Sequence, residues 1–159
     1  MARILVAYFS RTNHTRHMAE AVAEGARGQA GASVECRPIA ELNARQLLDF
    51  DAIVLGSPTY YGAMAAELKK LLDDSVAFHG QLEGKVGGAF SSSANIGGGN
   101  ETTVLSIVQA LLIHGMVIQG TASGDHYGPV AIGDVDNRAR QECLKLGRNV
   151  AALTVKLHG

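Results

Sequence analysis

Short apolar runs alternate along the chain with longer segments in which apolar residues recur every three or four positions. The short runs are typical of buried strands, and the longer segments of amphipathic helices. The predicted strands are Arg3–Phe9, Ser33–Ile39, Asp51–Leu55, Lys85–Ser91 and Met116–Gly120. The predicted helices are His14–Arg27, Glu41–Leu48, Ala63–Asp74, Glu101–His114 and Asp136–His158.

Strands and helices alternate five times, with no repeat or linker between them. This order predicts an α/β fold in one domain, residues 1–159, with a parallel sheet covered by helices on both faces. Pro38, near the end of the second predicted strand, favours an edge position for that strand. In such folds ligands bind at the carboxyl ends of the strands, so the loops at these ends are the candidate ligand-binding segments.

The loop after the first predicted strand, Ser10–Thr15, contains hydroxyl and amide side chains and no acid. It leads into a helix, whose first backbone N–H groups and positive dipole end suit a phosphate. The alternative is a polar helix cap made by Ser10 or Thr12. The loop is not a Walker A motif, because GxxxxGK[ST] is absent.

Two more loops of small polar residues follow predicted strands. Gly56–Gly62 places two tyrosines between glycines, which suits a flat ring but also an ordinary turn with packed tyrosines. Ser91–Asn100 could wrap the polar edge of a ring with backbone donors, or form an exposed turn. The three loops would border one cleft, and this convergence favours the ligand-binding interpretation.

Composition narrows the classes of function. The chain has 159 residues, a net charge of -1 and 5% aromatic residues, and it lacks a basic run, so a nucleic-acid surface is not expected. Cys36 and Cys143 are far apart, and His14 and His17 lack a third ligand nearby, so neither a disulfide framework nor a metal site is supported. With no signal peptide or membrane-spanning run, a cytoplasmic protein is expected.

The loop sequences resemble those of a known family. Ser10–Thr15, Gly56–Gly62 and Gly97–Thr103 look like the three FMN loops of flavodoxin-like proteins, and the best match is the WrbA-type NAD(P)H:quinone oxidoreductases. Similarity extends over nearly the whole chain and includes His114–Ile118 and Tyr127-Gly128. The resemblance implies a five-stranded sheet in the order 2-1-3-4-5 and FMN as cofactor.

The resemblance also implies the roles of individual residues. The ribityl phosphate would lie on the first loop, at Ser10, Arg11, Thr12, Asn13, His14 and Thr15. The isoalloxazine ring would lie against Pro58, Thr59, Tyr60, Tyr61 and Gly62. The pyrimidine edge of the ring would face Ser92, Ser93, Ala94, Asn95, Gly97 and Gly98. FMN carries the chemistry in such proteins, so no catalytic acid, base or nucleophile is expected.

The chain departs from the family pattern at several positions. Asn13 replaces a usual Gly, and Asn tolerates a left-handed backbone better than most residues. A Trp that closes over the ring in many relatives is absent, and Phe78 is a candidate substitute. His126 and Tyr127 are candidates for gating substrate or placing a proton donor at the ring, although a polar turn explains them equally well.

Two classes of function remain. An enzyme would pass electrons from NAD(P)H to a quinone or similar acceptor, whereas a flavodoxin would shuttle electrons between redox protein partners. Carriers that dock basic partners tend to be strongly acidic, and a net charge of -1 fits that class poorly, so the enzyme is favoured. A regulatory flavoprotein without turnover is a third interpretation. A homo-oligomer, dimer or tetramer, is expected.

Overall fold

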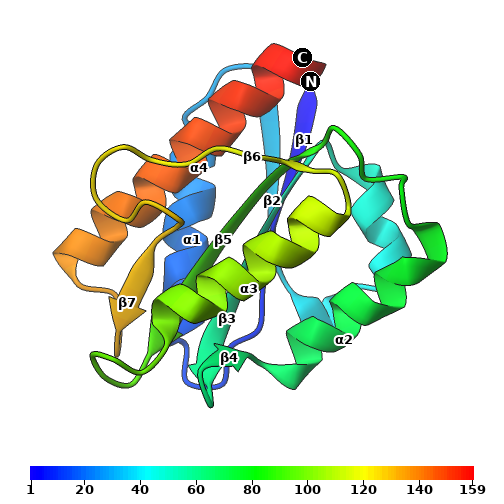
Figure 1. Ribbon diagram of the computed structural model, residues 1–159. Helices are drawn as coiled ribbons and strands as arrows, with labels where there is room; N and C mark the ends of the chain where they lie inside the picture. Colours follow the sequence, from blue (N-terminus) through cyan, green and yellow to red (C-terminus); the bar gives the residue numbers. More distant parts are fainter.

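A parallel sheet with helices on both sides forms the protein, as a computed structural model of residues 1–159 shows (Figure 1). The strands are β1 (Ala2–Tyr8), β2 (Ala32–Pro38), β3 (Ala52–Tyr60), β4 (Ala63–Met64), β5 (Val86–Ser93), β6 (Val117–Ile118) and β7 (Val130–Ile132). The helices are α1 (His14–Arg27), α2 (Ala66–Asp74), α3 (Asn100–Ile113) and α4 (Asn137–His158). Short 3-10 helices span Ile39–Glu41, Ala44–Asp49 and Ser75–Phe78.

The sheet follows the order β2-β1-β3-β5-β6, and every pair on this path is parallel. This confirms the flavodoxin-like α/β fold. The strand β2 lies at the edge and is only half-buried, as Pro38 indicated. β1, β3 and β5 are buried along most of their length, because helices cover both faces of the sheet.

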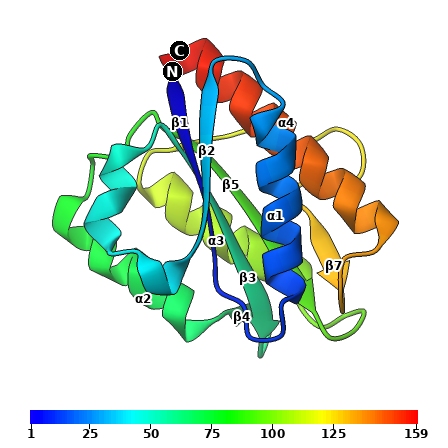
Figure 2. The same cartoon turned by 180° about the vertical axis from the view of Figure 1, so that it is seen from behind.

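Each face of the sheet has its own apolar core. α1 and α4 pack on one face, where Met18, Val22 and Cys143 are fully buried (Figure 2). α2 and α3 cover the other face, with Leu68 and Ile107 in its core. None of the helices combines the length and the apolar character needed to cross a bilayer.

The fifth strand differs from its prediction over Met116–Gly120, because it is split in two. β6 pairs with β5 only at Val86 and Gly87, whereas β7 pairs with Ser91–Ser93 at the opposite end of β5. β7 lies between the strand predicted over Met116–Gly120 and the helix predicted from Asp136, where no strand was predicted. The sheet therefore contains seven strands, two of them only two residues long, and the five-stranded description is approximate.

Other boundaries also shift. The helix predicted from Ala63 begins at Ala66, because Ala63 and Met64 pair with the end of β3 as the antiparallel β4. The helix predicted over Glu41–Leu48 is replaced by two 3-10 helices, the second of which has a capping box between Asn43 and Gln46. The predicted last helix is confirmed, with the Asp136 carboxylate capping the Ala139 N–H at 2.7 Å.

Candidate active site

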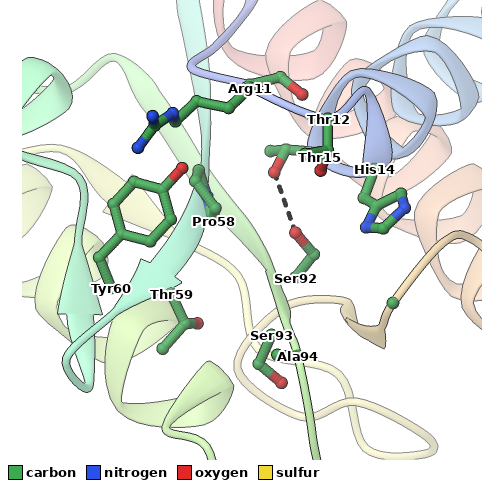
Figure 3. A pocket seen from close by; sticks show the side chains of 12 residues that line it. Arg11, Thr12, His14, Thr15, Pro58, Thr59, Tyr60, Ser92, Ser93 and Ala94 are labelled. Atoms are coloured by element: carbon green, nitrogen blue, oxygen red, sulfur yellow. Dashed lines mark hydrogen bonds between the residues drawn. The ribbon is translucent and has the colours of Figure 1, made fainter.

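The carboxyl ends of β1, β3 and β5 surround a cleft of about 690 Å³ (Figure 3). All three loops singled out in the sequence contribute to its wall. The lining residues are Ser10, Arg11, Thr12, His14, Thr15, Pro58, Thr59, Tyr60, Ser92, Ser93, Ala94 and Gly133. The convergence predicted from parallel strand order is therefore present in the structure.

The first loop presents a cluster of free backbone donors. None of the N–H groups of residues 11–15 donates a hydrogen bond within the chain. The next N–H along, that of Arg16, donates to the Ser10 hydroxyl at 3.3 Å. Asn13 adopts the left-handed region with φ 69°, as its chemistry allowed, and this turn directs the loop into α1. Such a concentration of donors at a helix start fits a phosphate group.

Two hydroxyl pairs connect the loops across the cleft floor. Thr15 Oγ1 and Ser92 Oγ lie 3.0 Å apart, and both side chains are buried (Figure 3). Thr59 Oγ1 and Ser91 Oγ are also 3.0 Å apart. These hydrogen bonds fix α1, β3 and β5 relative to one another, so the wall of the cleft is pre-formed.

The loop Gly56–Gly62, which carries Tyr60 and Tyr61, is held in place by Phe9 and by the start of α3. The rings of Phe9 and Tyr60 make an edge contact with centroids 6.4 Å apart. Tyr61 is fully exposed and has φ 50°, which is rare for an aromatic residue. The Thr102 hydroxyl donates to the Gly62 carbonyl at 3.0 Å, and a β-carbon on Gly99 would lie 2.8 Å from Gly62 Cα. The start of α3 therefore positions the turn beside the cleft.

In the third loop, which follows β5, the hydrogen bonds centre on Ser93. Its hydroxyl donates to the Asn95 carbonyl at 3.1 Å and accepts from the Asn100 side chain at 3.0 Å. Its carbonyl accepts the N–H of Gly133 at 2.8 Å, which brings the segment after β7 to the cleft. Gly133 was not predicted from the sequence, because a single glycine at the end of a polar stretch does not indicate a binding residue.

The lining is cationic and lacks carboxylates. Arg11 carries its only permanent charge, and His14 is its only other titratable base. The nearby carboxylate of Asp134 is bonded to His17 Nδ1 at 2.8 Å. That hydrogen bond, together with one from the Val135 N–H, lowers the pKa of Asp134. The cleft therefore favours an anionic ligand.

Several predicted residues lie outside the lining. The residues of the three loops that are not part of this lining are Asn13, Tyr61, Gly62, Asn95, Gly97 and Gly98. His126 and Tyr127 border a separate hollow of about 70 Å³ beside α3, where His126 Nδ1 donates to the Thr121 carbonyl at 2.7 Å.

Phe78 requires a correction. Its side chain is 3% exposed and belongs to the core between the sheet and α2 and α3, where its ring stacks on His114. It ends the 3-10 helix Ser75–Phe78, which follows α2, and it is not among the residues that line the cleft. Phe78 therefore cannot close over a ligand in the cleft in place of the missing Trp.

The model of the family described as NADPH-dependent FMN reductase matches residues 37–128, more than half of the chain. The chain belongs to this family. It is thus an FMN-dependent oxidoreductase with NAD(P)H as electron donor, and the resemblance to flavodoxin-like oxidoreductases is confirmed.

Individual relatives and solved structures are similar over nearly the whole chain. An NAD(P)H dehydrogenase (quinone) from Nitrobacter winogradskyi is 37% identical, and the alignment covers 100% of both chains. A flavodoxin from Aquifex aeolicus is also 37% identical over 95% of this chain and 86% of that protein. The structure of a WrbA-like flavodoxin from Agrobacterium tumefaciens matches with a TM-score of 0.81 and 28% identity, over 99% of each chain.

Proposed function

We propose that the protein passes electrons from NAD(P)H to a quinone or similar small acceptor. The observation that carries the proposal is a pre-formed cleft with free backbone donors and positive charge, and with no carboxylate in its lining. Such a cleft accepts an anionic cofactor and does not repel an anionic nucleotide approaching it. The relatives named NAD(P)H dehydrogenase (quinone) support the choice of acceptor.

The residues present fit FMN. The free N–H groups of residues 11–15, with the hydroxyls of Ser10 and Thr12, would hold its phosphate. Pro58, Thr59 and Tyr60 would lie against the ring, and the strand end from Ser92 to Ala94 would face its polar edge. Bound FMN supplies two-electron redox chemistry, so the chain contributes binding, orientation and access.

The flavodoxin relative makes electron transfer between proteins a second candidate function. A carrier of this kind would need a docking surface around the cleft. Acidic carriers use carboxylates near the cofactor to steer basic partners, and the lining here has none. This difference favours a small-molecule acceptor.

Anaerobic mixing of FMN-loaded protein with NADPH, and separately with NADH, tests the proposal through the flavin absorbance. We expect complete bleaching by at least one nucleotide and recovery of the absorbance on addition of benzoquinone. Bleaching by dithionite but by neither nucleotide would contradict the enzyme and favour the carrier. Failure to retain FMN would contradict both functions.

The proposal includes a homo-oligomer, dimer or tetramer, located in the cytoplasm. The outer face of α3 supports self-association, since Leu105, Leu112 and Ile113 are exposed there. Light scattering coupled to size-exclusion chromatography measures the mass directly. A mass near the 16.7 kDa of one chain would contradict this part of the proposal.

A further inference from the structure

Arg11 stands out within the cleft because its guanidinium has no partner. It forms no ion pair, and no hydrogen bond within the chain involves its side chain, which is exposed. Most other arginines of the chain are paired, as Arg16 is with Glu20 and Arg140 is with Glu24. An unpaired guanidinium at the wall of a ligand cleft is available to an anion from outside.

The side chain of Arg11 also points away from the donor cluster. In Figure 3 it extends toward Tyr60, whereas Thr12, Thr15 and His14 lie on the other side of the cleft. The backbone donors of residues 11–15 and the hydroxyls around them already satisfy the needs of one phosphate. The guanidinium is therefore not needed for the phosphate site at residues 11–15, and it lies on the side of the cleft where Tyr60 is (Figure 3).

We propose that Arg11 binds a phosphate group of the nicotinamide nucleotide and so determines affinity for the electron donor. This inference rests on the proposed function, because a nucleotide must approach the ring that Tyr60 borders. A guanidinium forms a two-pronged contact with phosphate oxygens, which a lysine ammonium cannot reproduce. No carboxylate in the lining competes for it or repels the nucleotide.

Two parts of the nucleotide carry phosphate, the pyrophosphate and the 2′-phosphate, and both share this chemistry. The pyrophosphate occurs in both NADPH and NADH, whereas the 2′-phosphate occurs in NADPH alone. Contact with the 2′-phosphate would make Arg11 a specificity residue for NADPH, and contact with the pyrophosphate would make it a binding residue for both donors. Comparing the two nucleotides separates these sources.

The test is calorimetric titration of the FMN-loaded protein with NADP⁺ and with NAD⁺, which bind without turnover. Arg11→Gln should weaken NADP⁺ binding about tenfold or more, since a charge-assisted contact is lost. Arg11→Lys should retain part of the affinity. Arg27→Gln is the matched control, because it removes the same charge at the last turn of α1, away from the cleft.

The dissociation constant of FMN, measured by quenching of its fluorescence, is the second measurement. We expect it to stay within about threefold of wild type in Arg11→Gln, because an exposed charge pointing away from the phosphate contributes little. A loss confined to NADP⁺ identifies the 2′-phosphate, and an equal loss for both nucleotides identifies the pyrophosphate. Weakened FMN binding with unchanged nucleotide binding would overturn the inference.

The two proposals fail in different ways. Wild-type protein that binds NADP⁺ but is not bleached by NADPH would refute the enzyme and leave the role of Arg11 standing. Wild-type protein that oxidises NADPH, with Arg11→Gln binding nucleotide equally well, would refute the role of Arg11 alone.

Discussion

The two ends of the sheet differ in the backbone groups that they leave free. At the amino end the chain satisfies polar groups internally: Lys85 Nζ donates to the carbonyls of Leu48 and Phe50, and the Asp51 carboxylate accepts the Arg3 N–H at 2.8 Å. At the carboxyl end the N–H groups of residues 11–15 have no acceptor in the chain. The polar groups named at the amino end bind one another, whereas the free donors at the carboxyl end remain available to a ligand.

The difference shows how one fold accommodates both requirements. Free donors cost little where they face water in an open cleft, but would be costly in a closed core. Substitutions at the carboxyl end should therefore change cofactor affinity most, and those at the amino end should change the free energy of unfolding.

The largest effect is expected from Asn13→Val. A β-branched side chain at φ 69° is strained, so the loop should rearrange and disperse its donors. We expect fluorescence titration to show FMN binding weakened about fivefold to thirtyfold, the equivalent of about 1–2 kcal/mol. Asn13→Gly, which removes the strain, should bind as wild type does. Unchanged affinity in Asn13→Val would show that the phosphate lies elsewhere.

Lys85→Met tests the amino end. It leaves the Leu48 and Phe50 carbonyls without their donor, so the free energy of unfolding should fall by about 1 kcal/mol, as measured by urea denaturation. FMN affinity should not change. Lys69→Met is the control, since Lys69 makes only an exposed pair with Asp73 and should cost less. A reduced FMN affinity with an unchanged free energy of unfolding would contradict the difference between the two ends of the sheet.

The smallest effect is expected from His114, which carries a buried polar atom without a hydrogen-bond partner at the amino end of the sheet. Ser75 Oγ donates to the Leu72 carbonyl, so His114 Nε2–H must donate to Ser75, which leaves His114 Nδ1 buried without a partner. Burial, and then the neighbouring His79, lower the pKa of His114 below its ordinary 6.5. The unfolded state therefore takes up the proton first as the pH falls.

Stability that depends on neutral His114 is thus complete above about pH 6.5 and is lost as the pH falls toward the folded pKa. The melting temperature should drop between pH 7.5 and 5.5, and His114→Gln should make that drop shallower. His158→Gln, with an exposed ring, is the control. An identical pH profile in wild type and His114→Gln would rule out this contribution.

Sequence reasoning recovered the features that depend on local pattern. The order of strands and helices followed from hydrophobic periodicity, and the edge position of β2 from Pro38. The left-handed turn at Asn13 followed from the family resemblance, because Gly is usual at that position and Asn tolerates the same backbone conformation. The meeting of the three loops followed from parallel topology, because carboxyl ends of such strands share one edge.

Features that depend on distant partners were not recoverable. β7 has three residues, Val130–Ile132, next to a proline and a glycine, and it exists because Ser91–Ser93 offer it a partner. Phe78 was a candidate for the place of the missing Trp because of the family resemblance, but its side chain packs in the core beneath α2 and α3. Neither the strand β7 nor the buried position of Phe78 can be predicted from the pattern of neighbouring residues in the sequence.

The interrupted fifth strand has a consequence for how the chain can be engineered. Between β6 and β7 the backbone leaves the sheet, and residues 119 and 120 are exposed and unpaired with any strand. An inserted reporter segment at this point would break no ladder between strands, and its closure entropy would rise only slowly with its length. Because the sheet is interrupted between β6 and β7, Gln119-Gly120 is a suitable insertion site for a second domain in this redox protein.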